Sequence, residues 1–217
     1  MIGSLTLKVC GITSVADARA AAVIGADYLG FILHPASPRY ISPEKYTAMA
    51  PHLPAVKKVG VVVQPTAEEL ARVVALGFDF IQLHFPNENS FFEVATWSEV
   101  VPPTRLWMAP RVPPGQELDH AFLPFADTFL VDTFHPDKFG GTGQTGDWPK
   151  FKNLQAAYPR KTWVLSGGLN PENIAAALAA TGATVVDVNS GVESAPGVKE
   201  HAKLLALATA LAAVARS

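Results

Sequence analysis

Short apolar, β-branched runs alternate with alanine-rich stretches along the whole chain, and this alternation constrains the fold more than any other feature of the sequence. Eight runs are typical of buried strands, at Leu5–Gly11, Tyr28–Leu33, Lys57–Val63, Phe80–His84, Arg105–Val112, Thr128–Thr133, Thr162–Gly168 and Val185–Ser190. The stretches that follow them predict helices, at Val15–Ile24, Pro43–His52, Ala67–Leu76, Asn89–Ser98, Gln116–Phe122, Pro149–Tyr158, Pro171–Thr181 and Lys199–Val214. Regular alternation of strands and helices predicts an α/β protein with a parallel sheet.

Eight strand–helix units in 217 residues predict a single-domain (β/α)8 TIM barrel that spans residues 1–217. An open, doubly wound sheet is the alternative, because alternation alone does not show whether the sheet closes. The first predicted strand is not followed by the G-x-G-x-x-G phrase of dinucleotide-binding sheets, which favours the barrel. Five prolines between residues 102 and 114 predict a loop-rich sector around the fifth helix.

The charge and composition exclude several classes of partner. The formal net charge is -2, whereas nucleic-acid binding requires a basic face, so we expect no nucleic-acid partner. The longest run of alanine and leucine, from Leu204 to Ala215, is too short to span a bilayer, so we expect no membrane span. A single cysteine cannot form an internal disulfide, which predicts a protein of the reducing cytoplasm.

Polar residues interrupt the predicted strands mainly near their C-terminal ends, where barrel enzymes carry their active sites. With a period of two they form same-face pairs, Lys8 with Cys10, Gln82 with His84 and Asp187 with Asn189, while Asp132 ends the sixth strand. Each has a structural interpretation too, the cysteine as a small buried apolar residue and Asp132 as a tie for the following loop. Because a buried polar group without a partner costs roughly 1–3 kcal/mol, the group as a whole predicts a functional site.

Glycines follow the seventh and eighth predicted strands, at Gly167-Gly168 and at Gly191 after Ser190. Glycine lets backbone N–H groups approach an anion, and these loops are the usual phosphate site of barrels, although ordinary tight turns are the alternative. After the second strand, Arg39 has the planar guanidinium that suits a carboxylate, but a loop arginine is most often a solvated charge. The six histidines lack metal-ligand spacing, so we infer no metal site.

At these positions the chain resembles the phosphoribosylanthranilate isomerases, enzymes of tryptophan biosynthesis. The resemblance runs nearly end to end and rests on phrases in the family's order, among them Lys8-Val9-Cys10-Gly11-Ile12-Thr13, Ser37-Pro38-Arg39, Gln82-Leu83-His84, Val131-Asp132, Gly140-Gly141-Thr142-Gly143, Ser166 to Asn173 and Ser190-Gly191-Val192-Glu193. It implies an Amadori rearrangement of N-(5-phosphoribosyl)anthranilate to 1-(2-carboxyphenylamino)-1-deoxyribulose 5-phosphate. The implied substrate is a phosphorylated sugar joined to anthranilate, and no cofactor is implied.

By position, the resemblance also implies roles for individual residues. Asp132 would be the general acid that protonates the furanose ring oxygen, and Cys10 the general base that removes the C2 proton. Arg39 would bind the anthranilate carboxylate. The other implied contacts with the substrate are made by Gly141 and Asp187 and, for the phosphate, by the backbone amides of Gly167, Gly168, Ser190 and Gly191.

The sequence leaves the activation of the thiol open. A free thiol is mostly protonated at neutral pH, so either Lys8, on the same strand face, or the cationic bound substrate has to favour the thiolate. The chain also departs from the family phrases, with Phe85 in place of a glycine after Gln-Leu-His, and with Gln144 and Gly146 in place of a lysine and a phenylalanine. We expect these differences to affect loops at the mouth, and hence lid behaviour and substrate affinity.

Two other functions stay open at this point. A histidine-pathway aminoaldose isomerase uses the same barrel, but that enzyme type has an acid at the first strand where this chain has Cys10. A non-catalytic phosphate-binding barrel would need neither Cys10 nor Asp132. The assembly is open between monomer and homodimer, because scattered apolar surface positions favour neither.

Overall fold

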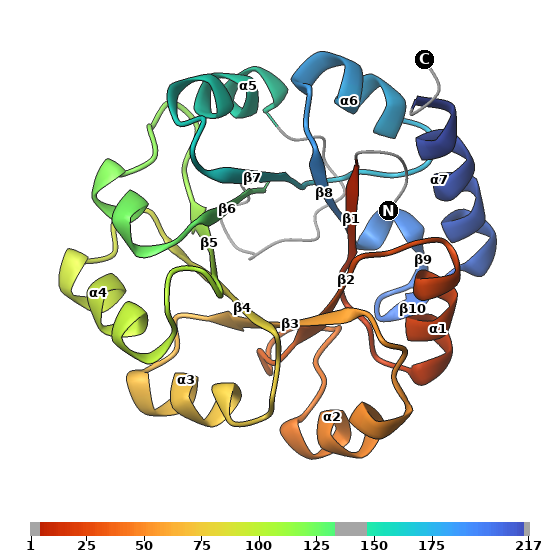
Figure 1. The fold of residues 1–217 in the computed structure, drawn as a ribbon, viewed down its shortest axis with the longest axis horizontal. Helices are drawn as coiled ribbons and strands as arrows, with labels where there is room; N and C mark the ends of the chain where they lie inside the picture. The colour runs from red at the N-terminus through yellow and green to blue at the C-terminus, as the bar shows by residue number, and fades with distance from the viewer. Residues whose placement is uncertain (1–4, 133–146, 215–217) are drawn as a thin grey trace.

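Eight parallel strands close into a barrel in the computed structural model, each hydrogen-bonded to the next and β8 to β1 (Figure 1). The structure describes residues 5–132 and 147–214. The barrel strands are β1 (Thr6–Val9), β2 (Tyr28–Ile32), β3 (Lys57–Val63), β4 (Phe80–Pro86), β5 (Leu106–Arg111), β6 (Thr128–Val131), β7 (Thr162–Leu165) and β8 (Val185–Val188). The predicted TIM barrel is therefore confirmed over the open sheet.

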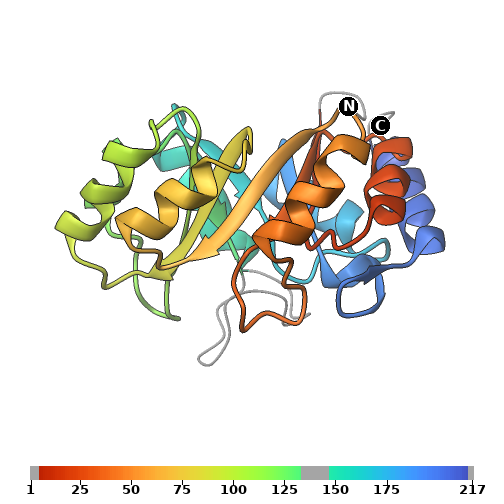
Figure 2. The same cartoon turned by 90° about the horizontal axis from the view of Figure 1, so that it is seen from below.

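Helices cover the outside of the ring of strands, and those of the first half follow one another along one flank (Figure 2). The α-helices are α1 (Val15–Val23), α2 (Pro43–Met49), α3 (Ala67–Val74), α4 (Phe91–Val100), α5 (Trp148–Ala157), α6 (Ile174–Thr181) and α7 (His201–Val214). Short 3-10 helices are η1 (Ala50–His52), η2 (His120–Phe125) and η3 (Ser190–Val192). Among the described residues, no helix is long and apolar enough to cross a membrane.

Side chains cap the first turns of several helices. Ser42 accepts the backbone N–H of Lys45 at the start of α2. Thr66 and Glu69 form a reciprocal capping box at the start of α3, in which each side chain accepts the other residue's backbone N–H. Caps of this kind satisfy N–H groups that have no partner within the helix, so they place the first turn.

The connection between β5 and β6 differs from the prediction. The sequence predicts a helix over Gln116–Phe122, but the structure has the 3-10 helix η2 there, starting at His120 and containing Pro124. Proline has no N–H to donate and clashes with the preceding turn, so an α-helical ladder is not sustained. The predicted α-helix is wrong in this sector, and the predicted loop-rich character is confirmed.

Inward-facing side chains of alternate strand positions fill the barrel. They form a cluster separate from the larger core between strands and helices, and its members are Cys10, Val59, Val61, Trp107, Ala109, Leu130, Val164 and Val185. Lys8 is fully buried, and its Nζ lies 5.9 Å from the centre of the Trp107 ring. The interior is thus a packed core that also holds the buried ammonium group of Lys8.

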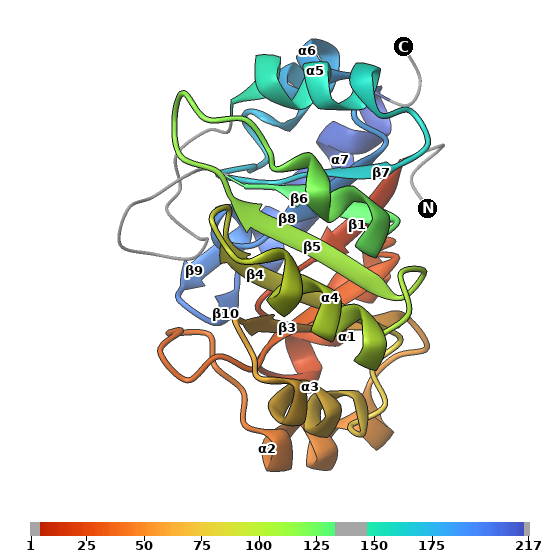
Figure 3. The same cartoon turned by 90° about the vertical axis from the view of Figure 1, so that its left-hand side faces the viewer.

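A short antiparallel hairpin follows β8, and the sequence did not predict it. It consists of β9 (Glu193–Ala195) and β10 (Val198–Lys199), and it turns at Gly197, whose φ is +81°. Figure 3 shows the hairpin at the same end of the barrel as the loop between β2 and α2. Because both follow the C-terminal ends of strands, the hairpin belongs to the rim where barrel active sites lie.

Candidate active site

A pocket opens at the C-terminal ends of the barrel strands, and most of the predicted site residues line it. These are Cys10, Arg39, Asp132, Gly167, Gly168, Asp187 and Ser190. Further polar residues in its walls are His34, Ser37, Gln82, His84, Ser166 and Asn189. Gly191 follows Ser190 without lining the pocket, and Gly141 lies outside the described residues. Segments from both ends of the chain therefore meet around one space.

The Cys10 thiol fits its place because the neighbouring strand carries a glycine beside it. A Cβ atom added at Gly30 would lie 2.6 Å from Cys10 Sγ and 3.1 Å from its Cα. Interiors are close-packed, so a side chain at position 30 would displace the thiol or the strand. Cys10 is 4% exposed, so only a small part of the residue is open to the pocket that it lines.

Beside Cys10, two charged residues of adjacent strands form an ion pair inside the barrel. Lys8 and Asp187 are register partners on β1 and β8, and Lys8 Nζ lies 2.6 Å from Asp187 Oδ2. Burial alone lowers the pKa of Lys8, but the Asp187 carboxylate raises it above its usual value, so the lysine stays charged. The other oxygen, Asp187 Oδ1, is buried and receives no hydrogen bond from the described residues. Asp187 lines the pocket, so this oxygen is a buried acceptor in the pocket wall.

The ion pair does not convert the neighbouring thiol into a thiolate. Burial raises the pKa of the Cys10 thiol above its ordinary value, and the positive charge of Lys8 only partly opposes this effect. The negative charge of Asp187 acts in the same direction as burial. The thiol is therefore protonated at neutral pH in the protein alone, and an additional positive charge is needed to favour the thiolate.

Asp132 comes directly after β6 and reaches the pocket from another part of the ring than Cys10. Three steps around the barrel, through β7 and β8, separate β6 from β1. Ser166 Oγ, in the loop after β7, donates a hydrogen bond to Asp132 Oδ1 over 3.3 Å. A thiol and a carboxyl that approach from different strands can act on different atoms of one bound molecule.

Gln82 and His84 form a polar pair on β4 in the pocket wall. The Gln82 and His84 Nε2 atoms lie 2.7 Å apart, and Gln82 Oε1 is buried without a hydrogen bond among the described residues. Burial, with the charges of Lys8 and His34, lowers the pKa of His84 to about 3. A neutral imidazole accepts the amide N–H at Nε2 and carries its proton on Nδ1. His84 is therefore an uncharged neighbour of the site at physiological pH.

The loops after β7 and β8 form one continuous wall. Gly167 and Gly168 have φ angles of +89° and +63°, which glycine adopts without strain. The Asn173 side chain donates a 2.9 Å hydrogen bond to the Gly168 carbonyl and so fixes the turn. A Cβ atom at Gly191 would lie 2.1 Å from the Leu169 carbonyl oxygen, so only glycine allows the two loops to touch. Ordinary turns would need no such contact between loops.

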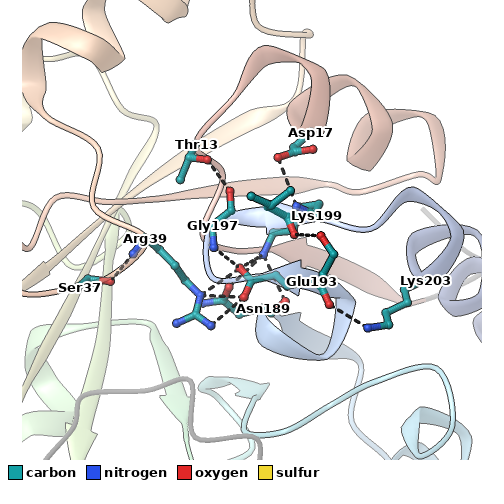
Figure 4. Close-up of polar contacts among 11 residues, drawn as sticks. Thr13, Asp17, Ser37, Arg39, Asn189, Glu193, Gly197, Lys199 and Lys203 are labelled. Atoms are coloured by element: carbon teal, nitrogen blue, oxygen red, sulfur yellow. Dashed lines mark hydrogen bonds and ion pairs between the residues drawn. The ribbon is translucent and has the colours of Figure 1, made fainter.

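Arg39 is buried in the rim and paired with an acid of the hairpin. Its Nε and Nη2 atoms lie 3.0 Å and 2.7 Å from the two carboxylate oxygens of Glu193. Lys199 Nζ lies 2.9 Å from Glu193 Oε1, and Figure 4 shows both cations on this one carboxylate. Arg39 is 8% exposed, which excludes its interpretation as a solvated surface charge. Among the described residues, no group of three or more acidic, histidine or cysteine side chains is arranged to hold a metal ion.

The sequence and the fold both match known proteins along almost the whole chain. The family model described as N-(5'phosphoribosyl)anthranilate (PRA) isomerase matches residues 7–210. The chain belongs to the PRA isomerase family. An N-(5'-phosphoribosyl)anthranilate isomerase of Synechococcus elongatus is 40% identical over 214 residues, which covers 96% of each chain. The predicted family membership is therefore confirmed.

Solved PRA isomerase structures share the barrel. The phosphoribosyl anthranilate isomerase of Thermus thermophilus superposes with a TM-score of 0.82 at 33% identity, over 96% of this chain and 99% of that one. Another PRA isomerase was solved in complex with reduced 1-(o-carboxyphenylamino)-1-deoxyribulose 5-phosphate. It has a TM-score of 0.76 at 32% identity, over 94% of this chain and 97% of that one.

One departure from the PRA isomerase phrases lies elsewhere than expected. Phe85 is fully buried beneath the helices, with its ring 5.1 Å from Trp97 and 5.3 Å from Phe122. The expectation that it shapes the mouth is wrong, because the strand period turns its side chain outward, away from the pocket that His84 faces. Gln144 and Gly146 lie outside the described residues.

Sequence reasoning missed three residues that shape this PRA isomerase site. Gly30 carries a readable signal, since a glycine within an apolar strand often marks a close approach. Glu193 ends one of the family phrases, but its partner Arg39 lies 154 positions away and cannot be read from the sequence. Lys199, six positions from Glu193, carries no signal that separates it from a surface charge. Only the arrangement of the rim loops brings these charges onto Arg39.

Proposed function

We propose that this protein isomerises N-(5'-phosphoribosyl)anthranilate to 1-(2-carboxyphenylamino)-1-deoxyribulose 5-phosphate in tryptophan biosynthesis. Membership of the PRA isomerase family supports the reaction. The observation that carries the residue roles is that a buried thiol, Cys10, and a carboxyl group, Asp132, line the same pocket from different strands. A proton donor and a proton acceptor on one substrate are what an Amadori rearrangement requires.

In the proposed mechanism, Asp132 donates a proton to the furanose ring oxygen. The bond between this oxygen and C1 breaks, and the nitrogen lone pair forms a protonated Schiff base at C1. Cys10, as the thiolate, removes the proton on C2, and the electrons of that C–H bond form the C1=C2 bond of an enolamine. The enolamine gains a proton at C1 and loses the one on its C2 oxygen, which leaves the ketone. The substrate nitrogen accepts the electrons, so no cofactor enters.

The proposed mechanism also accounts for a thiol whose resting form is protonated. Asp132 is protonated when the substrate binds, and once the ring has opened, the Cys10 thiol releases its proton to solvent and becomes the thiolate that takes the C2 proton. The Schiff base is a cation that forms next to C2, and a nearby positive charge lowers the pKa of a thiol. Lys8 contributes less, because Asp187 balances its charge at 2.6 Å. Of the two sources of activation that the sequence leaves open, the structure favours the substrate's own charge.

The remaining roles concern the ends of the substrate. Arg39 binds the anthranilate carboxylate, and the unpaired oxygen of Asp187 accepts a hydrogen bond from a sugar hydroxyl. Glycine-rich loops with open backbone N–H groups suit a phosphate. The proposed phosphate contacts are the backbone amides of Gly167, Gly168, Ser190 and Gly191. Gly141 stays a predicted contact outside the described residues.

The test is an isomerase assay on the purified protein and two variants, with N-(5'-phosphoribosyl)anthranilate as substrate. Cys10→Ala and Asp132→Asn should each fold like the wild type and lose about 100-fold or more in kcat, as expected for a lost general acid or base. Asp127→Asn is the matched control for Asp132→Asn. Asp127 is a 56% exposed carboxylate that directly precedes β6, whereas Asp132 directly follows it. Its substitution should leave kcat unchanged.

Three results would contradict the proposal. Full activity of either catalytic variant would remove that residue from the chemistry. Unfolding of both would show that these positions serve the core. Turnover of the histidine-pathway aminoaldose substrate alone would assign the protein to the other isomerase type.

A further inference from the structure

Two charged residues of the hairpin lie behind Arg39 without reaching the pocket. Arg39 lines the pocket, whereas Glu193 and Lys199 do not. Glu193 is only 7% exposed and Lys199 only 3%. Burying charged side chains costs free energy unless they are well paired. Surface charges serve solubility, so these buried ones need a different explanation.

Glu193 holds one edge of the Arg39 guanidinium group. Arg39 Nε lies 3.0 Å from Oε1 and 3.1 Å from Oε2 of Glu193, and Nη2 lies 2.7 Å from Oε2. This fork-shaped contact fixes the plane of the guanidinium. Nη1 forms no hydrogen bond with the described residues, so it is the donor group left for a ligand.

Lys199 keeps Glu193 from cancelling the charge of Arg39. Its Nζ lies 2.9 Å from Glu193 Oε1 and also donates to Asn189 Oδ1, at 3.0 Å. Two cations therefore share one carboxylate, and the three charged side chains keep a net positive charge. Although burial alone raises the pKa of Glu193, the hydrogen bonds and charges of Arg39 and Lys199 hold it below the usual value.

The hairpin that carries Glu193 is itself fixed. The Gly197 N–H donates to Glu193 Oε1 over 3.2 Å, and the Gly197 carbonyl accepts a hydrogen bond from the Thr13 hydroxyl in the loop after β1. Lys203 Nζ, on α7, donates to the Glu193 carbonyl over 2.8 Å. These contacts hold the hairpin in place and, with it, the carboxylate that pairs with Arg39.

We propose that Glu193 is a positioning residue for Arg39 and that Lys199 is its charge partner. Glu193 turns the free edge of the guanidinium toward the pocket, and Lys199 preserves the positive charge that a ligand carboxylate needs. This inference rests on the proposed function, in which Arg39 binds the anthranilate carboxylate. Glu193 should therefore act on recognition of the carboxylate and not on proton transfer.

The test compares binding of two probes by calorimetry. One is reduced 1-(o-carboxyphenylamino)-1-deoxyribulose 5-phosphate, and the other is the same compound without the carboxylate. The wild type should prefer the first about 10-fold or more, as one charge-assisted hydrogen bond allows. Glu193→Gln should lose most of this preference and bind the second probe unchanged. In the assay its KM should rise about 10-fold, while kcat changes less than about 3-fold.

Glu200→Gln is the matched control. Glu200 lies seven positions after Glu193, is 40% exposed and pairs with Lys203. It should keep the wild-type preference. The double variant Arg39→Ala/Glu193→Gln should lose no more than Arg39→Ala, because Glu193 acts through Arg39. If Glu193→Gln does not fold, Glu193→Asp keeps the charge and withdraws it by one methylene, and it should also lose the preference.

The outcomes separate the two proposals. A wild type that binds both probes equally would refute carboxylate binding by Arg39, and the positioning role with it. A wild type that prefers the carboxylate, with a Glu193→Gln or Glu193→Asp variant that keeps this preference, would overturn the positioning role alone. Additive losses in the double variant would overturn it as well.

Discussion

Two buried charge clusters lie next to the same pocket, and they differ in how their charges balance. In the barrel interior, Lys8 and Asp187 pair one to one at 2.6 Å, on strands held in register. At the rim, Arg39 and Lys199 share the single carboxylate of Glu193, on a loop and a hairpin. The same kinds of side chain thus form a neutral pair in one place and a cationic cluster in the other.

The difference divides the electrostatics of the site. Beside the neutral pair, burial raises the pKa of the Cys10 thiol, and the charges of Lys8 and Lys199 only partly oppose this effect. A cationic cluster at the rim attracts an anion before any chemistry takes place. Charge balance, more than residue type, separates the part of the pocket that we propose for proton transfer from the part that we propose for binding.

The largest effect should come from breaking the interior pair. Lys8→Met and Asp187→Leu each leave a buried charge without its partner, so each should lower the free energy of unfolding by about 3–5 kcal/mol. The double variant should recover at least half of this loss, because it removes both charges and keeps the volume. Urea denaturation measures all three proteins. Additive losses in the double variant would show that packing, and not the ion pair, determines the stability here.

The rim cluster should tolerate the loss of one cation better. Lys199→Met removes three hydrogen bonds of Nζ but leaves Glu193 paired with Arg39, so the free energy of unfolding should fall by about 1.5–3 kcal/mol. Lys203→Met removes a 42% exposed lysine next to the hairpin. It should lower the free energy of unfolding by less than about 1 kcal/mol. A loss at Lys199 as large as at Lys8 would erase the distinction between the two clusters.

The smallest effect should be the pH dependence of stability that comes from His84. It tests whether the barrel interior disfavours a second positive charge beside Lys8. His84 has a pKa of about 3 in the fold, against about 6.5 when unfolded, because burial and the Lys8 charge oppose its protonation. Between these two pKa values the unfolded chain binds more protons than the folded protein. The contribution of His84 to the free energy of unfolding is therefore complete above pH 6.5 and is lost as the pH falls toward 3. From pH 7 to pH 5 the wild type should lose about 1–2 kcal/mol more than His84→Gln. Parallel losses in the two proteins would show that His84 is protonated without cost.

The period of the apolar residues was enough to predict the barrel, because buried parallel strands and their covering helices leave different repeats in a sequence. The same period put Cys10, Gln82 and Asp187 on faces that the structure turns toward the pocket. It failed at Gln116–Phe122, where a proline within η2 prevents an α-helix. The apolar period also did not predict the hairpin after β8, because β9 and β10 are too short to show a repeat.

The sequence by itself determined the strands, most of the helices, and which strand ends bear reactive groups, because each of these depends on neighbours along the chain. Only the tertiary structure decided how the charges combine. The partners of Lys8 and Arg39 lie 179 and 154 positions away, and closure of the ring brings them into contact. Coulomb interactions act over a few ångströms of space whatever the separation in sequence, so the neutral pair and the cationic cluster exist only in the folded barrel.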